Sequence, residues 1–149
     1  MLSFVKKYWL WIVAVLYTLL IFRNSFATGQ QSGSLSTAIT QVFYNFLVKI
    51  RITVPFDTLH FFVRKAAHFS EFFVLGFLVY QANIRQPLFQ KPWICILLWM
   101  ILPPLMDEAI QLFTPGRSGM VTDSLIDMSG YLLAWLLSLW LFPKKEKQE

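Results

Sequence analysis

Polar side chains that could carry chemistry are concentrated in one stretch of this chain, residues 107–130, between long apolar runs. Carboxylates close together in low-dielectric surroundings suit acid–base catalysis or cation binding, and an arginine suits the binding of a phosphate or carboxylate. A largely apolar chain must place such groups at a membrane surface or in a polar interior, because hydrocarbon does not solvate them. The candidate site residues of this stretch are Asp107, Glu108, Gln111, Arg117, Asp123 and Asp127.

A second polar group precedes this stretch. Arg64, His68 and Glu71 occupy positions i, i+4 and i+7, a spacing that places them on one face of a helix. The imidazole of His68 and the carboxylate of Glu71 are candidate general bases, and Arg64 is a candidate partner for an anion. Together with Asp107 and Glu108, His68 and Glu71 form the set of candidate catalytic residues.

The composition of the chain indicates an integral membrane protein. Its 149 residues suit a single domain and are 56% hydrophobic, 17% aromatic and 14% charged. The mean hydropathy is +0.55. The net charge of +5 comes from basic residues that flank apolar runs, a pattern of membrane orientation and anionic lipid contact rather than of nucleic-acid binding. The single cysteine, Cys95, excludes an intrachain disulfide and a cysteine-based metal site.

The elements that position these residues are predicted to be helices only. We expect an all-α integral membrane bundle of four transmembrane helices, with an amphipathic helix lying in the interface between the first and second spans. The Gly/Ser/Gln-rich segment 28–36 indicates a loop, and apolar residues at helical spacing place the interfacial helix at about 35–50. The first span is expected to be an uncleaved anchor. The predicted spans are residues 8–26, 61–81, 93–113 and 122–142.

The positions of basic residues predict an N-in, C-in orientation in the membrane, since lysine and arginine near helix ends favour the cytoplasmic side. The residues assigned to that side are Lys6, Lys7, Arg85, Lys91, Lys144, Lys145 and Lys147.

Three predicted spans place their ionisable groups at a common depth. Counted at about 1.5 Å per residue from the inner helix ends, His68 lies roughly 20 Å, Asp107 roughly 21 Å and Asp127 roughly 23 Å across the membrane. We expect these groups to face the bundle, since a charge facing lipid is unfavourable by about 2.5–3.5 kcal/mol on insertion scales. Pairing of Arg64 and Arg117 with the carboxylates would neutralise them.

An ordered set of motifs runs along the chain: RKAAHFSEF at 64–72, Asp107-Glu108-x-x-Gln111, Pro115-Gly116-Arg117, Asp123 and Asp127-x-x-Gly130. This set resembles the VanZ-like family, and the resemblance runs from about residue 25 to the end of the last predicted helix. That family comprises small bacterial membrane proteins whose founding member lowers susceptibility to the glycopeptide teicoplanin. The resemblance therefore implies a contribution to teicoplanin-type glycopeptide resistance.

Three classes of function remain open for these residues. They could form an ion-pair network that holds the helices in register. They could bind or move an anionic envelope lipid, a lipid-linked precursor or the glycopeptide itself at an outward-facing polar site, with Arg64 and Arg117 holding a phosphate. They could also catalyse modification of such a lipid, with His68, Glu71 or Asp107 as acid–base groups. No cofactor is required, but a divalent cation held by Asp107, Glu108, Asp123 and Asp127 is an alternative.

Overall fold

The computed structural model describes residues 2–142, with side chains from residue 5 onward, and confirms the all-α prediction. Three of its helices are long and apolar enough to cross a membrane, over Val5–Ser25, Pro92–Leu112 and Val121–Leu141. The helices are α1 (Leu2–Ser25), α2 (Gly29–Lys49), α3 (Phe56–Arg85), α4 (Pro92–Leu112) and α5 (Val121–Leu141).

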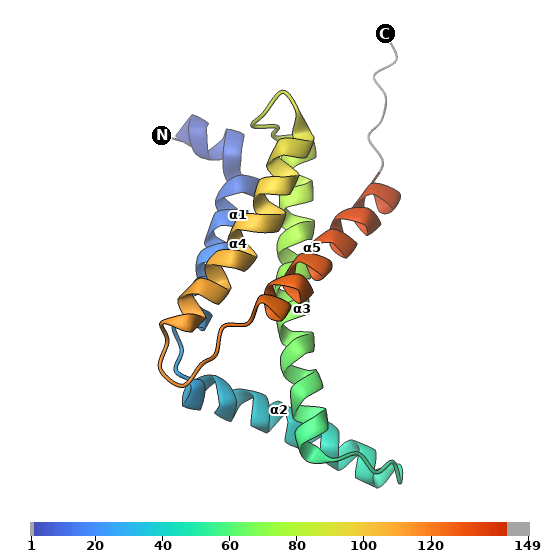
Figure 1. Cartoon of the computed structure of the whole chain (residues 1–149). Helices are drawn as coiled ribbons and strands as arrows, with labels where there is room; N and C mark the ends of the chain where they lie inside the picture. The colour runs from blue at the N-terminus through green and yellow to red at the C-terminus, as the bar shows by residue number, and fades with distance from the viewer. Residues whose placement is uncertain (1, 143–149) are drawn as a thin grey trace.

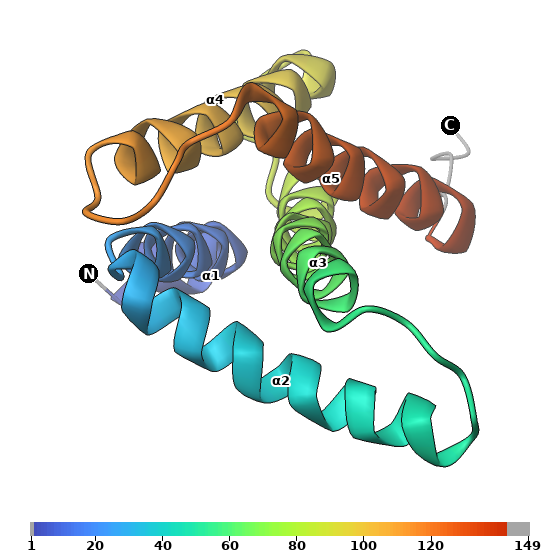
Figure 2. The same ribbon diagram turned by 60° about the horizontal axis from the view of Figure 1, so that its bottom comes forward.

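The longest helix, α3, is the centre of the molecule. It packs against α1, α2, α4 and α5, and its most extensive contact is with α5 (Figure 1). In Figure 1, α1 and α4 lie along one side of α3, while α2 runs across one end of the molecule. Figure 2 shows α3 between α2 and α5. Side chains on different faces of α3 therefore meet different neighbours.

Two glycines allow α3 and α5 to approach closely, as small residues do between membrane helices. A methyl group added at Gly76 would lie 2.5 Å from the backbone oxygen of Tyr131. One added at Gly130 would lie 2.3 Å from the backbone oxygen of Phe69. Ala134 and Ser138 continue this buried strip of small residues along α5. At these glycines the backbones of α3 and α5 are therefore in direct contact.

The amphipathic helix α2 begins earlier than expected, so the loop predicted over residues 28–36 is wrong. Thr28 caps the helix: its hydroxyl accepts from the Gln31 amide, and the Gln31 side chain accepts from the Thr28 amide. This reciprocal pair satisfies two amides that have no partner inside the helix, which compensates for the Gly/Ser-rich first turn. Much of the apolar side of α2 is exposed, including Leu35, Val42 and other large side chains.

The C-terminal end of α3 also differs from the prediction, because the helix continues beyond residue 81 to Arg85. It stops just before Pro87, whose ring disfavours helical geometry in the preceding residue. Gln86, which ends the helix, holds α1: its side-chain oxygen accepts from the Leu10 amide at 3.2 Å, and its backbone oxygen accepts from Trp11 Nε1 at 2.6 Å. These bonds place the start of α1 and the α3–α4 loop at the same end of the molecule.

The predicted basic tail at Lys144, Lys145 and Lys147 lies outside the described residues. The orientation that depends on it remains a prediction, as does the crossing of the membrane by α3, which is not among the three apolar candidate spans.

Candidate functional site

Four buried side chains from α3, α4 and α5 meet in what we term the acidic cluster: His68, Asp107, Glu108 and Asp127. One nitrogen or oxygen from each of these side chains lies within 4.8 Å of those from the other three. Asp107 is 1% and Asp127 0% exposed. The close approach of α3 and α5 brings His68 Nδ1 to 3.3 Å from Asp127 Oδ1. The cluster has the donor set of a metal site or of a proton-sharing network.

Asp107 is held from two sides. The hydroxyl of Ser25, the last residue of α1, donates to one carboxylate oxygen, and Gln111 Nε2 donates to the other at 2.6 Å. Gln111 therefore supports Asp107 and is itself only 2% exposed. Ser25 was missed by sequence reasoning; it belongs to the short polar segment Arg23-Asn24-Ser25 that follows the first apolar run.

Glu108 is held by the backbone of the loop between α4 and α5. Its Oε2 accepts from the Met120 amide at 2.7 Å, while its Oε1 is buried without a hydrogen-bond partner. Gly119 fits this loop against α4, since an added methyl group would lie 2.5 Å from the Glu108 backbone oxygen. One carboxylate oxygen is thus anchored and the other is available.

Asp123 lies apart from the acidic cluster and forms an ion pair with Lys65 of α3. Sequence reasoning did not include Lys65 and expected the arginines to neutralise the carboxylates. That expectation is wrong: among residues 5–142, neither Arg64 nor Arg117 forms an ion pair with a carboxylate. Lys65 directly follows Arg64, so it projects from a different side of α3, toward α5, because each residue rotates a helix by about 100°.

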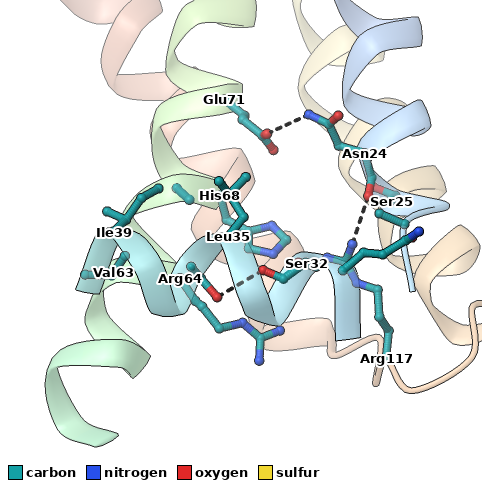
Figure 3. A pocket seen from close by; sticks show the side chains of 14 residues that line it. Asn24, Ser25, Ser32, Leu35, Ile39, Val63, Arg64, His68, Glu71 and Arg117 are labelled. Carbon is teal, nitrogen blue, oxygen red and sulfur yellow. Dashed lines mark hydrogen bonds between the residues drawn. The ribbon is translucent and has the colours of Figure 1, made fainter. Parts of the chain in front are cut away.

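Arg64 and Arg117 instead line a cavity of about 250 Å³, which we term the arginine cavity (Figure 3). Its wall also includes His68 and Glu71 of α3. The helix α2 closes one side with Leu35 and neighbouring residues, and Figure 3 shows His68 and Leu35 near the middle of the wall. The cavity therefore combines a polar region that contains two guanidinium groups with an apolar wall.

Asn24 forms hydrogen bonds with both Glu71 and Arg117, which line this cavity with it. Its side-chain amide donates to Glu71 Oε1 at 3.3 Å, and its backbone oxygen accepts from an Arg117 terminal nitrogen at 3.1 Å (Figure 3). Sequence reasoning did not include Asn24 among the candidate site residues. Its role depends on where the α4–α5 loop returns, which local sequence does not specify.

The loop that carries Arg117 is fixed by contact with the start of α2. The Gly29 amide donates to the Pro115 oxygen at 3.0 Å. Gly116 has a φ of +73°, a conformation that favours glycine. Burial lowers the pKa of the Arg117 guanidinium below its ordinary value, and its Nε is buried without a partner. An arginine nevertheless stays charged at neutral pH, so Arg117 contributes a positive charge to the cavity.

A second cavity of about 190 Å³ lies on the other side of Arg64 and His68, and Lys65 and Asp123 line it. The structure thus divides the single predicted site into parts. Arg64, His68, Glu71 and Arg117 line the arginine cavity, whereas Asp107, Glu108 and Asp127 lie in the acidic cluster and Asp123 in the second cavity. Only His68 belongs to all three of these sites.

Comparison with known proteins identifies the family. A family model described as VanZ/LLP1 matches residues 8–142, which includes every candidate site residue. No curated protein and no solved structure matches the chain. The match covers nearly all of the sequence, with most of α1 and the whole of α2 to α5, and together with three apolar helices it indicates a membrane protein. The chain belongs to the VanZ/LLP1 family.

Proposed function

We propose that this chain is a four-span protein of the bacterial cell membrane that binds an anionic headgroup in the arginine cavity. The headgroup belongs to an envelope lipid or a lipid-linked precursor, and its binding contributes to resistance to teicoplanin-type glycopeptides. One observation carries the proposal: Arg64 and Arg117 line one cavity, and neither forms an ion pair with a carboxylate among the side chains described. Guanidinium groups bind phosphate with paired, charge-assisted hydrogen bonds.

The wall of the cavity suits an amphipathic ligand. Leu35, Ile39 and Val63 supply apolar surface close to the two arginines. A lipid presents the matching arrangement, with an anionic headgroup joined to hydrocarbon. A small hydrophilic anion would leave the apolar wall unused. This favours a lipid or lipid-linked ligand over a free solute.

The packing of α3 supports four spans. Its 30 residues rise about 45 Å, which exceeds the hydrocarbon thickness of about 30 Å. It packs against all three apolar candidate spans, and many of its polar groups, including His68 and Gln81, are buried between helices. A helix enclosed by three spans crosses the membrane with them, and its low overall hydropathy reflects groups that do not face lipid.

The position and composition of α2 support an interfacial helix. It lies across one end of the bundle (Figure 1). It exposes large apolar side chains such as Val42, Phe43 and Phe46. The N-in, C-in orientation would place α2 and the arginine cavity on the outer side, where glycopeptides act.

The first test measures headgroup binding by purified protein. We expect the wild type to retain phosphatidylglycerol over phosphatidylcholine in native mass spectrometry, and the double variant Arg64→Gln/Arg117→Gln to lose at least about tenfold of that preference. The matched control is Arg51→Gln/Arg85→Gln, which removes two exposed arginines outside the cavity. Equal retention by both double variants would contradict the proposal.

The same variants test the link to resistance. Expression of the wild type in a teicoplanin-susceptible bacterium is expected to raise the inhibitory concentration, and the cavity variant should not do so at equal membrane abundance. An unchanged inhibitory concentration with abundant wild-type protein would separate headgroup binding from resistance.

A second candidate function, catalysis on the bound lipid, is favoured by the position of His68. Its Nδ1 faces Asp127 at 3.3 Å while the same residue lines the cavity beside Glu71. A carboxylate that orients an imidazole is an arrangement used in general base catalysis. Catalysis predicts a chemically altered lipid after incubation with pure protein, whereas binding alone predicts recovery of the lipid unchanged.

A further inference from the structure

The acidic cluster lacks the positive charge that its burial requires. Among the described side chains there are two ion pairs, Lys65 with Asp123 and His68 with Asp127. Lys65 is thereby assigned to Asp123, so the three carboxylates of the cluster share one imidazole. Burying charged carboxylates is strongly unfavourable unless they are paired or bind a metal.

Unpartnered atoms point into the same small volume. Oδ2 of Asp127 and Oε1 of Glu108 are buried without a hydrogen-bond partner, and Oδ1 of Asp127 has only the 3.3 Å contact with His68 Nδ1. Asp127 is fully buried, so bulk solvent does not reach its carboxylate. Buried acceptors without donors are rare in folded proteins, and here they coincide with the most charged part of the interior.

The surrounding contacts orient the carboxylates as the outer partners of metal ligands do. Ser25 and Gln111 fix the two oxygens of Asp107, and the Met120 amide fixes one oxygen of Glu108, while the other is buried without a partner. Hydrogen bonds of this kind set the direction of ligating carboxylates and are characteristic of metal sites.

We infer that the acidic cluster binds one divalent transition-metal ion, Zn²⁺ or Mn²⁺, through His68, Asp107, Glu108 and Asp127. The candidate ligand atoms lie within 4.8 Å of one another. Ligand atoms at about 2.0–2.2 Å from an ion lie at most about 4.4 Å apart, so small side-chain movements complete the coordination. The imidazole favours a transition metal over Mg²⁺ or Ca²⁺. His68 replaces Asp123 in the set that sequence reasoning considered.

The proposal is tested with metal ions alone, without lipid. Full-length protein is purified in detergent, treated with EDTA, equilibrated with Mn²⁺ or Zn²⁺ and passed through a gel-filtration column. We expect about one bound ion per chain by mass spectrometry of the metal, and a higher unfolding temperature than with Mg²⁺. A wild-type chain that retains neither ion and shows no shift would overturn the proposal, whatever the behaviour of any variant.

Substitutions then locate the ion. Asp127→Asn and His68→Gln are expected to lose it, and Ser25→Ala, which removes only an outer partner, should weaken affinity roughly 10- to 100-fold. Asp123→Asn is the matched control on the same helix and should retain the ion. Loss in Asp123→Asn with retention in His68→Gln would overturn the assigned ligand set.

Binding of Co²⁺ gives a spectroscopic check that does not depend on variant stability. Coordination by imidazole and carboxylates is expected to produce visible absorption that EDTA removes. The Arg64→Gln/Arg117→Gln variant should keep this absorption, so failure of headgroup binding and failure of metal binding are distinguishable.

Discussion

Two adjacent residues of α3, Arg64 and Lys65, show how differently the two sides of this helix are built. Lys65 pairs with Asp123 of α5, and the side chains are 19% and 7% exposed. Arg64 is exposed and lines the arginine cavity without an ion pair to a described carboxylate. On the α5 side the lysine is paired with a carboxylate beside the second cavity, whereas on the α2 side two guanidinium groups line the arginine cavity. Two adjacent basic residues thus have different roles: Lys65 holds α3 against α5, and Arg64 remains available to a ligand.

The largest effect that separates the two sides is expected from Lys65→Met. Removing one partner of a buried ion pair leaves the other uncompensated, and with the partial exposure of this pair we expect a loss of about 3 kcal/mol in unfolding free energy. The adjacent Arg64→Met should stay within about 0.5 kcal/mol of the wild type. Denaturant unfolding in micelles measures the unfolding free energy of both variants. Equal losses in the two variants would contradict the proposed difference between the two sides of α3.

The next effect concerns the glycines. Gly130→Ala forces a methyl group into the backbone of α3 and should destabilise the protein by about 1–3 kcal/mol. Gly33→Ala in α2 is the matched control, because an added methyl group there meets nothing within 4 Å. The control should be neutral or slightly stabilising, since alanine favours helix. Thermal unfolding in detergent distinguishes the two, and a stable Gly130→Ala variant would show that the α3–α5 interface can open.

The smallest effect is expected at the start of α2. Thr28→Ala removes the capping hydroxyl and should destabilise the first turn by about 1 kcal/mol, which corresponds to about fivefold faster amide exchange there. Amides in α5 should exchange as in the wild type. Ser34→Ala serves as the control, because its hydroxyl bonds only to a backbone oxygen of its own helix. Acceleration throughout the protein would mean that α2 and α5 do not open independently.

Much of the fold could be predicted from sequence, because membrane helices are recognisable from long apolar runs and from the helical spacing of apolar residues. The predicted boundaries of the last two spans lie within one residue of α4 and α5. The error at residues 28–36 arose from weighing glycine and serine as loop residues. The Thr28 and Gln31 pair was a visible capping signal that favours a helix.

The sequence predicted that the ionisable groups of the candidate site lie at a common depth in the membrane. It did not predict which basic side chain pairs with which carboxylate. Counting residues brought His68, Asp107 and Asp127 to one level, and the structure places them in one cluster. The residue count could not show that Lys65, rather than Arg64, forms an ion pair with a carboxylate. That outcome depends on the rotation of α3 relative to α5, which the backbone contacts at Gly76 and Gly130 determine.

The link between α1 and α2 has a mechanical consequence. Ser25 holds a carboxylate of the interior, and Thr28 starts the helix that covers the opening. Three steps of backbone separate them, so the two residues stay within roughly 10 Å of each other even when that link is fully stretched. An occupant that lifts the start of α2 further than this must unwind the end of α1 or pull Ser25 away from Asp107. Because the link between Ser25 and Thr28 is short, a large displacement of α2 would disturb the contact between Ser25 and Asp107.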